Sequence, residues 1–216
     1  MSVTLILADD HPIVRQGLRH LLEGEPGFLI LAEAGDGLEA LRLVELLKPK
    51  ILIVDMMMPG LNGLEVLRRV KKISPSTRTI VLSMQSADAY VVEALKNGAA
   101  GYVLKETGPS ELVKAVHEVT LGNQFLSAKL SERFQNSGRE IQDTPPDAYE
   151  TLTAREREIF QMTVEGLTSQ EIGEKLMISP RTVEIHRSNL TAKLGIKNQA
   201  DLIRLAIKRG ILSMDE

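Results

Sequence analysis

Three acidic residues follow apolar runs early in the chain. Asp9 and Asp10 come directly after the run 3–8, and Asp55 comes directly after the four apolar residues 51–54. Runs of this kind, rich in β-branched residues, are typical of strands buried on both faces of a parallel sheet. Because open α/β sheets bind ligands at the carboxyl ends of their strands, we expect these carboxylates at a ligand site. Taken alone, Asp55 could equally cap a turn.

Two further apolar runs end in a hydroxyl and an amine, at Ser83 and Lys105. If the sheet has the common order 2-1-3-4-5, its first and third strands are neighbours and the acids crowd into one crevice. Clustered like charges require a counter-charge, and Mg²⁺ suits such a site because it prefers oxygen ligands. Asp55 could then act as a nucleophile toward phosphorus, with Ser83 and Lys105 stabilising the phosphoryl oxygens.

Alternating apolar and amphipathic segments position these residues. Strands that alternate with helices in this way are typical of an α/β doubly wound parallel sheet with helices on both faces. The expected strands are 3–8, 28–34, 51–55, 79–83 and 101–104, and the expected helices are 12–23, 37–47, 63–73, 87–97 and 109–121.

Composition limits the class of protein. The 216 residues can form one or two domains, and without cysteine there is no disulfide framework. There is neither an apolar run long enough to span a membrane nor a secretion leader, so we expect a cytoplasmic protein. The four histidines are scattered, which argues against a zinc site. Residues 180–210 hold seven basic against two acidic side chains, which could suit a polyanion or form an ordinary solvated surface.

The polar residues at the strand ends, with the run Met-Pro-Gly-Leu-Asn-Gly at 58–63, resemble the receiver domain of two-component response regulators. The similarity covers residues 1–121 and implies a flavodoxin-like sheet of five strands in the order 2-1-3-4-5. It implies that Asp55 takes a phosphoryl group from a sensor histidine kinase, with Mg²⁺ held by Asp9, Asp10 and Asp55. It also implies a switch in which Ser83 turns toward the phosphate, the Tyr102 ring moves inward, and Lys105 binds the phosphate.

Two residues near these positions have plainer interpretations. Without the resemblance, Tyr102 would be a partly buried tyrosine with its hydroxyl in water. Met57, two residues after Asp55, offers no base to activate water. We therefore expect an acyl phosphate at Asp55 to persist longer than it would beside an acid.

Residues 122–147 have the composition of a linker, with Ser-Gly at 137–138 and Pro-Pro at 145–146. Apolar residues at 126, 130 and 134 recur every four positions, so a short helix could dock on either domain. We expect the linker to join the receiver domain, 1–121, to a second domain over 148–216.

Helix start signals follow in quick succession in the last third. Thr153 with Glu156 and Thr168 with Glu171 form two capping boxes, and Ser179 caps a third helix that begins at Pro180. A fourth begins after Asn198, which predicts an all-α bundle of four short helices.

The helix 180–194 carries the functional prediction. Val183, Leu190 and Leu194 line one face, which we expect in the core, whereas the opposite face is mostly polar. In a helix–turn–helix, the exposed face of the second helix enters the major groove of DNA. Glu184 could accept from cytosine N4, and Ile185 could touch a thymine methyl or be an ordinary surface aliphatic. The candidate DNA-binding residues are Arg181, Thr182, Glu184, Ile185, His186, Arg187, Ser188 and Lys193.

The pattern from Leu152 to Leu194, including Glu171-Ile172 and Ser179-x-x-Thr182-Val183-x-x-His186, resembles the LuxR-type DNA-binding domain. With the receiver, the chain resembles a NarL/FixJ-class response regulator. Glu184 replaces a frequent lysine, and Ser-Gln at 169–170 replaces the more usual Asn-Lys. The resemblance implies a homodimer on phosphorylation, an inverted-repeat site in double-stranded DNA, and RNA polymerase as a further possible partner. The candidate dimerisation residues are Leu202, Ile203 and Ala206.

The function expected from these observations is a transcription regulator activated by phosphorylation, without enzymatic activity beyond its own phosphoryl transfer and dephosphorylation. One alternative is an aspartyl-phosphate hydrolase, against which the missing acid at position 57 and the helical bundle argue. Another is a DNA-binding protein whose receiver docks partners independently of phosphate. A third is a ligand-sensing relative, although sparse aromatic residues leave no evident apolar pocket.

Overall fold

The computed structural model describes residues 2–59, 61–137, 148–209 and 211–212. They form two compact units, the first made mainly of residues up to 142 and the second mainly of residues from 143 onward. Each unit has a hydrophobic core of its own. Among the described helices, none combines the length and apolar character that a membrane span requires.

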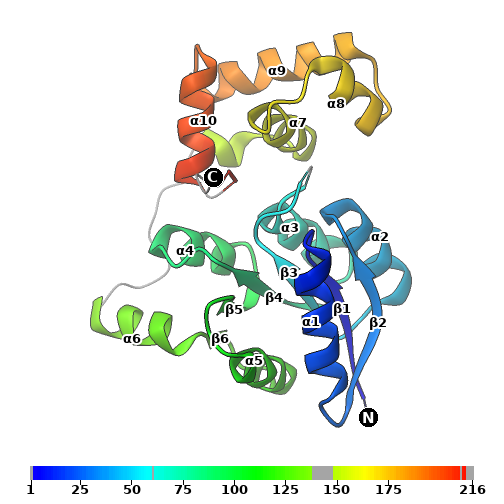
Figure 1. The fold of residues 1–216 in the computed structure, drawn as a ribbon. Helices are drawn as coiled ribbons and strands as arrows, with labels where there is room; N and C mark the ends of the chain where they lie inside the picture. The colour runs from blue at the N-terminus through cyan, green and yellow to red at the C-terminus, as the bar shows by residue number, and fades with distance from the viewer. Residues whose placement is uncertain (1, 60, 138–147, 210, 213–216) are drawn as a thin grey trace. The chain divides into compact units, whose positions relative to one another are not determined.

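The first unit is a parallel sheet with helices on both faces (Figure 1). Its strands are β1 (Val3–Ala8), β2 (Phe28–Ala34), β3 (Ile51–Asp55), β4 (Arg78–Ser83), β5 (Ala99–Leu104) and β6 (Phe125–Leu126). Its helices are α1 (Pro12–Glu23), α2 (Gly37–Leu47), α3 (Gly63–Ile73), α4 (Asp88–Lys96), α5 (Pro109–Leu121) and α6 (Ala128–Ser137). The order β2-β1-β3-β4-β5-β6 confirms the doubly wound sheet, with β1 beside β3.

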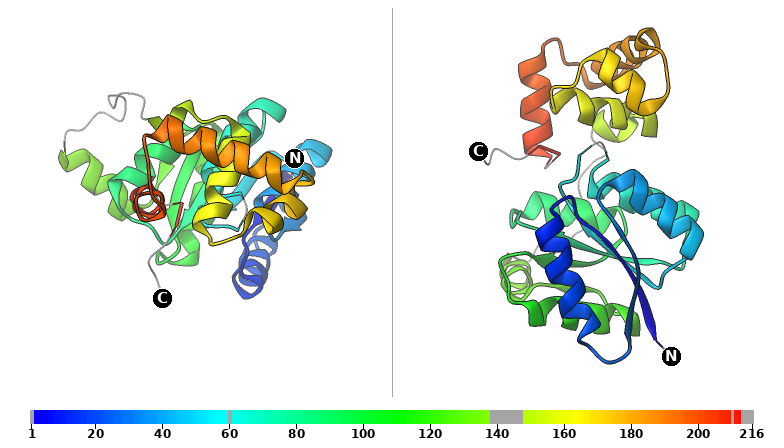
Figure 2. Two further views of the ribbon diagram at one scale, coloured as in Figure 1. Left: turned by 90° about the horizontal axis from the view of Figure 1, so that it is seen from above. Right: turned by 45° about the vertical axis from the view of Figure 1, so that its right-hand side comes forward.

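Alternating side chains of the strands supply two apolar layers. On one face Leu5, Leu7 and Ile53 pack against α1 and α5. The helices α2, α3 and α4 cover the opposite face, and the further views of Figure 2 show the same two layers. All five residues of β3 are buried, as expected for a central strand covered on both sides.

The sheet has six strands where the sequence predicts five. The additional strand, β6, pairs in parallel with β5 through Gly101 with Phe125 and Tyr102 with Leu126. Two residues are too few for a periodic pattern, so the sequence assigns them to the linker. A short helix is present as α6 and includes residues 130 and 134, whereas Leu126 lies in β6; Leu130 is fully buried in the first unit.

The second unit is all-helical. It contains the 3₁₀ turn η1 (Ala148–Thr151) and the helices α7 (Ala154–Val164), α8 (Ser169–Leu176), α9 (Pro180–Leu194) and α10 (Gln199–Lys208). Both predicted capping boxes form, at Thr153 and Thr168, and Ser179 caps α9. In Figures 1 and 2, α10 runs at a large angle to α9.

Candidate functional site

Asp55 lies at the carboxyl end of β3, between β1 and β4. The chain then turns back so that Gly63, the first residue of α3, donates its backbone N–H to the Met56 carbonyl at 3.0 Å. A Cβ on Gly63 would lie 2.5 Å from the carbonyl oxygen of Asp55. Only glycine therefore allows α3 to begin directly against the backbone that carries Asp55.

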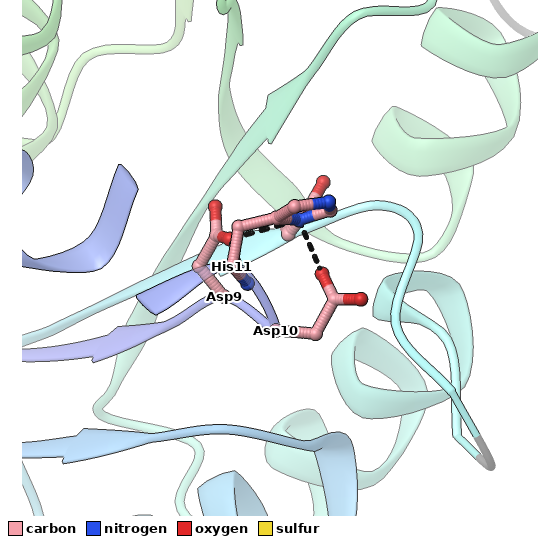
Figure 3. A group of neighbouring side chains, drawn as sticks. Asp9, Asp10 and His11 are labelled. Atoms are coloured by element: carbon pink, nitrogen blue, oxygen red, sulfur yellow. Dashed lines mark hydrogen bonds and ion pairs between the residues drawn. The ribbon is translucent and has the colours of Figure 1, made fainter. Parts of the chain in front are cut away.

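Carboxylates from two neighbouring strands converge at this point. Asp9, Asp10, His11 and Asp55 each offer a ligand atom, and these atoms all lie within 4.8 Å of one another. Figure 3 shows the His11 ring reaching toward both Asp9 and Asp10, with Nδ1 2.9 Å from Oδ1 of Asp10. From its place beside the acidic pair in the sequence, His11 could lie near a metal or merely start the first helix. It is the N-cap residue of α1 without a side-chain capping bond, and its side chain is 67% exposed.

Lys105 supplies a counter-charge for two of these carboxylates. Its Nζ donates to Oδ2 of Asp9 at 2.8 Å and to Oδ2 of Asp55 at 2.7 Å. Burial raises the pKa of Asp55 above its ordinary value, Lys105 opposes that effect, and the charge of Asp9 adds to it. Burial lowers the pKa of Lys105, but Asp55 and Asp9 outweigh that effect and hold it above its ordinary value.

The donor set fits a hard divalent cation such as Mg²⁺. Oδ1 of Asp10 is enclosed from solvent and accepts no hydrogen bond from the described residues, although His11 Nδ1 lies nearby. Asp9 and Asp55 together bring two further carboxylates and share a single lysine. Three carboxylates that share one ammonium and one exposed histidine form a set to which a cation can still bind.

Ser83 and Tyr102 both contact the loop between β4 and α4. Ser83 is fully buried, and its Oγ accepts from the backbone N–H of Gln85 at 3.0 Å. The Tyr102 hydroxyl donates to the Gln85 carbonyl at 2.8 Å, and its ring is fully buried. The alternative of a partly buried tyrosine with a solvated hydroxyl is therefore wrong. Burial raises the pKa of Tyr102 above its ordinary value, so its hydroxyl stays protonated.

The segment after α5 is attached both to β5 and to the same loop, which the sequence did not predict. Oγ of Ser127 accepts from the Leu104 backbone N–H at 3.0 Å. Arg133 of α6 donates to the Ser86 carbonyl and forms an ion pair with Asp88 at 2.7 Å. The only sequence signal for these contacts is the four-residue apolar period, which predicts a helix but not its partner.

In the second unit, α9 presents the polar face that the sequence predicts. Val183 and Leu190 are fully buried. The candidate residues Arg181, Glu184, Ile185, Ser188 and Lys193 are exposed, and Thr182, His186 and Arg187 are half-buried. These eight residues do not all remain available to a ligand, because several bind within the unit.

Four of the candidate DNA-binding residues are engaged by neighbouring side chains, among them Glu184, which accepts from Oγ of Ser169. Lys193 donates to Oε2 of Glu156 at 2.7 Å. Oγ1 of Thr182 lies 2.8 Å from Oγ of Ser179. Arg187 donates to two hydroxyls in other helices, as described below. Arg181, Ile185 and Ser188 are exposed and project from the same side of the helix, at spacings of three and four residues.

The candidate dimerisation residues differ in burial. Leu202 and Ala206 are 6% and 0% exposed and belong to the core of the second unit, whereas Ile203 is half-buried. A side chain already enclosed in its own unit has no exposed area to lose at a dimer interface. We therefore correct the predicted dimer contacts by omitting Leu202 and Ala206 and keeping Ile203.

Comparison with known proteins matches each of the two units to a protein family. Residues 5–117 match the response regulator receiver domain, and residues 150–206 match the bacterial regulatory proteins of the luxR family. The chain is 35% identical over 198 residues to the nitrate/nitrite response regulator protein NarL of Escherichia coli K12, with 92% of each chain covered. It is 34% identical over 214 residues to the oxygen regulatory protein NreC of Staphylococcus aureus USA300, covering 96% of this chain and 98% of NreC.

A solved complex of the two-component response regulator RcsB with DNA is 28% identical, with a TM-score of 0.60 over 96% of this chain and 99% of RcsB. The similarity therefore extends over both units in sequence and over nearly the whole chain in structure. The chain belongs to the two-component response regulators of the NarL/FixJ class, transcription regulators controlled by phosphorylation, in which a receiver domain precedes a LuxR-type DNA-binding domain.

Proposed function

We propose that Asp55 is the phosphoacceptor and that its phosphorylation controls DNA binding by α9. The observation that carries this proposal is the position of Lys105 Nζ, 2.7 Å from Asp55 and 2.8 Å from Asp9. A buried carboxylate at a strand end, with an ammonium and further acids beside it, meets the needs of phosphoryl transfer.

The proposed partner is a sensor histidine kinase that carries a phosphohistidine. An oxygen of Asp55 attacks phosphorus, the phosphorus–nitrogen bond breaks, and its electron pair returns to the imidazole. Lys105 donates to the phosphoryl oxygens, and Ser83 gives up its bond to Gln85 to reach them. Asp9, Asp10 and Asp55 would hold Mg²⁺, which neutralises charge on the phosphoryl group when it is bound. No other catalysis is proposed for the chain.

The phosphorylated side chain carries about −1.5 to −2 charges in place of the single charge of the carboxylate, and it presents new acceptor oxygens. Ser83 and Lys105 can bind phosphoryl oxygens only in the modified state, and this added binding biases the β4–α4 loop toward a second arrangement. The buried Tyr102 hydroxyl donates to the Gln85 carbonyl, so a displacement of this loop would break or lengthen that hydrogen bond.

The proposed target is double-stranded DNA with an inverted repeat, bound by a homodimer. Arg181, Ile185 and Ser188 offer exposed side chains to the major groove. Ile203 of α10 is the proposed dimer contact. RcsB, with which this chain shares its fold, has been solved in complex with DNA. RNA polymerase is a further proposed partner at the promoter.

Incubation of the full chain with acetyl phosphate and Mg²⁺ tests the phosphoacceptor. We expect one added phosphoryl group by intact mass, located at residue 55 after borohydride reduction converts the acyl phosphate to homoserine. Asp55→Asn should take up none, and omission of Mg²⁺ should greatly slow the reaction. Glu118→Gln, a substitution far along α5, is the matched control and should be labelled normally.

DNA binding with and without the phosphodonor then separates the proposal from its alternative. Stronger binding on phosphorylation, lost in Asp55→Asn, supports control through Asp55. Equal binding by both proteins with the phosphodonor present would instead favour a receiver that docks partners independently of phosphate.

A further inference from the structure

A chain of hydrogen bonds joins α7, α8 and α9 and ends on Glu184. Thr163 of α7 donates its hydroxyl to the Ile159 carbonyl at 2.6 Å and accepts from Nε of Arg187 at 3.0 Å. Nη1 of Arg187 donates to Oγ of Ser169, at the start of α8, at 2.9 Å. The Ser169 hydroxyl donates in turn to Oε1 of Glu184.

In this hydrogen-bond network, each hydroxyl accepts from Arg187 and donates its own hydrogen to another group. A hydroxyl has one hydrogen to donate, and Thr163 directs it to a backbone carbonyl, so Thr163 accepts from Arg187. Ser169 likewise accepts from Arg187 and directs its own hydrogen to Glu184. The guanidinium of Arg187 serves both hydroxyls at once because it holds several N–H donors in a fixed geometry. Its Nη1 also lies 3.7 Å from Oε1 of Glu184.

The two ends of this hydrogen-bond network, Thr163 and Glu184, differ in burial. Thr163 is 5% exposed, the Arg187 side chain is 27% exposed, and the Glu184 side chain is 62% exposed. A long carboxylate on an open helix face ordinarily samples several rotamers and loses that freedom when it binds a ligand. A carboxylate held beforehand by groups anchored in the core loses less, which favours both affinity and selectivity.

We propose that Arg187 and Ser169 are positioning residues that hold Glu184 ready to accept a hydrogen bond from the N4 amino group of cytosine. The inference rests on the proposed function, in which the exposed face of α9 enters the major groove. In that groove a carboxylate can accept from cytosine N4, whereas the O6 of guanine and the O4 of thymine repel it. Arg187 and Ser169 therefore set a base preference through Glu184, without touching the base themselves.

Direct contact of Ser169 and Arg187 with phosphate is the competing role. Loss of a phosphate contact weakens binding to all sequences alike and reduces the dependence of affinity on salt. Loss of a positioning residue changes the preference at one base pair and leaves the salt dependence intact. The two roles therefore give different results in the same measurement.

The test uses the full chain with acetyl phosphate and Mg²⁺ to select sites from a random double-stranded DNA library. The unaltered protein should select cytosine at one position of each half-site, and Glu184→Ala should lose that preference by about tenfold. Ser169→Ala and Arg187→Lys should lose about threefold at the same position only. Ser169→Thr keeps the hydroxyl and should keep the preference, and Glu118→Gln, on α5 of the receiver and outside the DNA-binding face, is the control.

Other results overturn the inference in distinguishable ways. If the unaltered protein selects no sequence at all, the proposed function fails together with the inferred role of Arg187 and Ser169. If it selects sites but Glu184→Ala changes no preference for cytosine, only the inference fails. A uniform loss of affinity with a smaller salt dependence in Ser169→Ala would assign that residue to phosphate instead.

Discussion

Two buried carboxylates of this chain each accept a hydrogen bond from a lysine at 2.7 Å, yet their pKa values are displaced in opposite directions. Asp55 in the receiver binds Lys105, and Glu156 in the DNA-binding domain binds Lys193. Little of either residue is exposed, 4% and 3%, but Asp55 lies much deeper in the protein than Glu156. Burial raises the pKa of each, and for Asp55 the net pKa is raised, whereas for Glu156 it is lowered.

Two causes separate them: the deeper burial of Asp55 raises its pKa more, and Asp55 has fewer donors to itself than Glu156. Asp55 shares its lysine with Asp9, and among the described residues its one other donor is the Met57 backbone N–H at 3.3 Å. Glu156 also accepts from the backbone N–H and the hydroxyl of Thr153, at 2.7 and 3.0 Å. A buried carboxylate whose hydrogen bonds are satisfied, like Glu156, stabilises the fold. One that competes for its donor retains affinity for a cation or a phosphoryl group.

Removing the shared lysine should produce the largest effect. Lys105→Ala leaves Asp9 and Asp55 buried with like charges and no ammonium, and we expect the receiver to lose about 3 kcal/mol of unfolding free energy at neutral pH. Mg²⁺ should restore part of that loss because it supplies the missing positive charge. Hydrogen exchange of peptides from the sheet measures both changes in the full chain.

Lys193→Ala is the matched control in the other domain. Glu156 keeps both of its donors from Thr153, and the Lys193 side chain is 38% exposed, so we expect a loss of about 1 kcal/mol or less. Mg²⁺ should have no effect on this variant. Equal losses in the two lysine variants would contradict the distinction drawn between the two carboxylates.

The backbone behind Asp55 provides a second test. Gly63→Ala would place its Cβ 2.5 Å from the Asp55 carbonyl oxygen, and we expect a loss of about 2 kcal/mol of unfolding free energy. The displaced strand end should also slow phosphorylation by acetyl phosphate. Gly17→Ala is the control, since its Cβ meets no atom within 4 Å in α1, and a stable, normally phosphorylated Gly63→Ala protein would contradict the prediction.

The receiver site could be predicted because topology determines it. Asp9 and Lys105 follow strands and Asp55 ends one, and the carboxyl ends of parallel strands meet at one edge of the sheet. The order of residue types along the chain therefore sufficed to bring them together. The strand β6 escaped prediction because two residues have no period, and Arg133 escaped because its partners lie 45 or more residues away.

The helical domain was predictable in its elements but not in its side-chain partners. Capping boxes are local and were read correctly, as were the buried positions Val183 and Leu190. The bond from Ser169 to Glu184 joins two helices, and no local pattern encodes it. For α10 the helical period identified an apolar stripe, but it could not say whether that stripe faces the core or a second subunit, and Leu202 and Ala206 face the core.

Tyr102→Phe should have a moderate and local effect. The change removes the hydrogen bond to the Gln85 carbonyl while the buried ring remains, so we expect a loss of about 1 kcal/mol. Hydrogen exchange should rise in residues 84–87 beside the phosphoacceptor and stay unchanged in α7 to α10. Unchanged protection of this loop would mean that Ser83 and Arg133 hold it without Tyr102.

Acid should distinguish the domains through Glu156. Its pKa is lowered in the folded domain, so its contribution to stability is fully present above the ordinary carboxyl value of about 4.3 and is lost as pH falls below that value. Glu156→Gln keeps an acceptor for the capping box but removes the charge that binds Lys193. We expect the variant to be about 0.5–1 kcal/mol less stable at neutral pH, with the difference vanishing near pH 3. A difference that persists in acid would mean that packing, rather than ionisation, makes Glu156 stabilising, and the contrast with Asp55 would then rest on shape and not on charge.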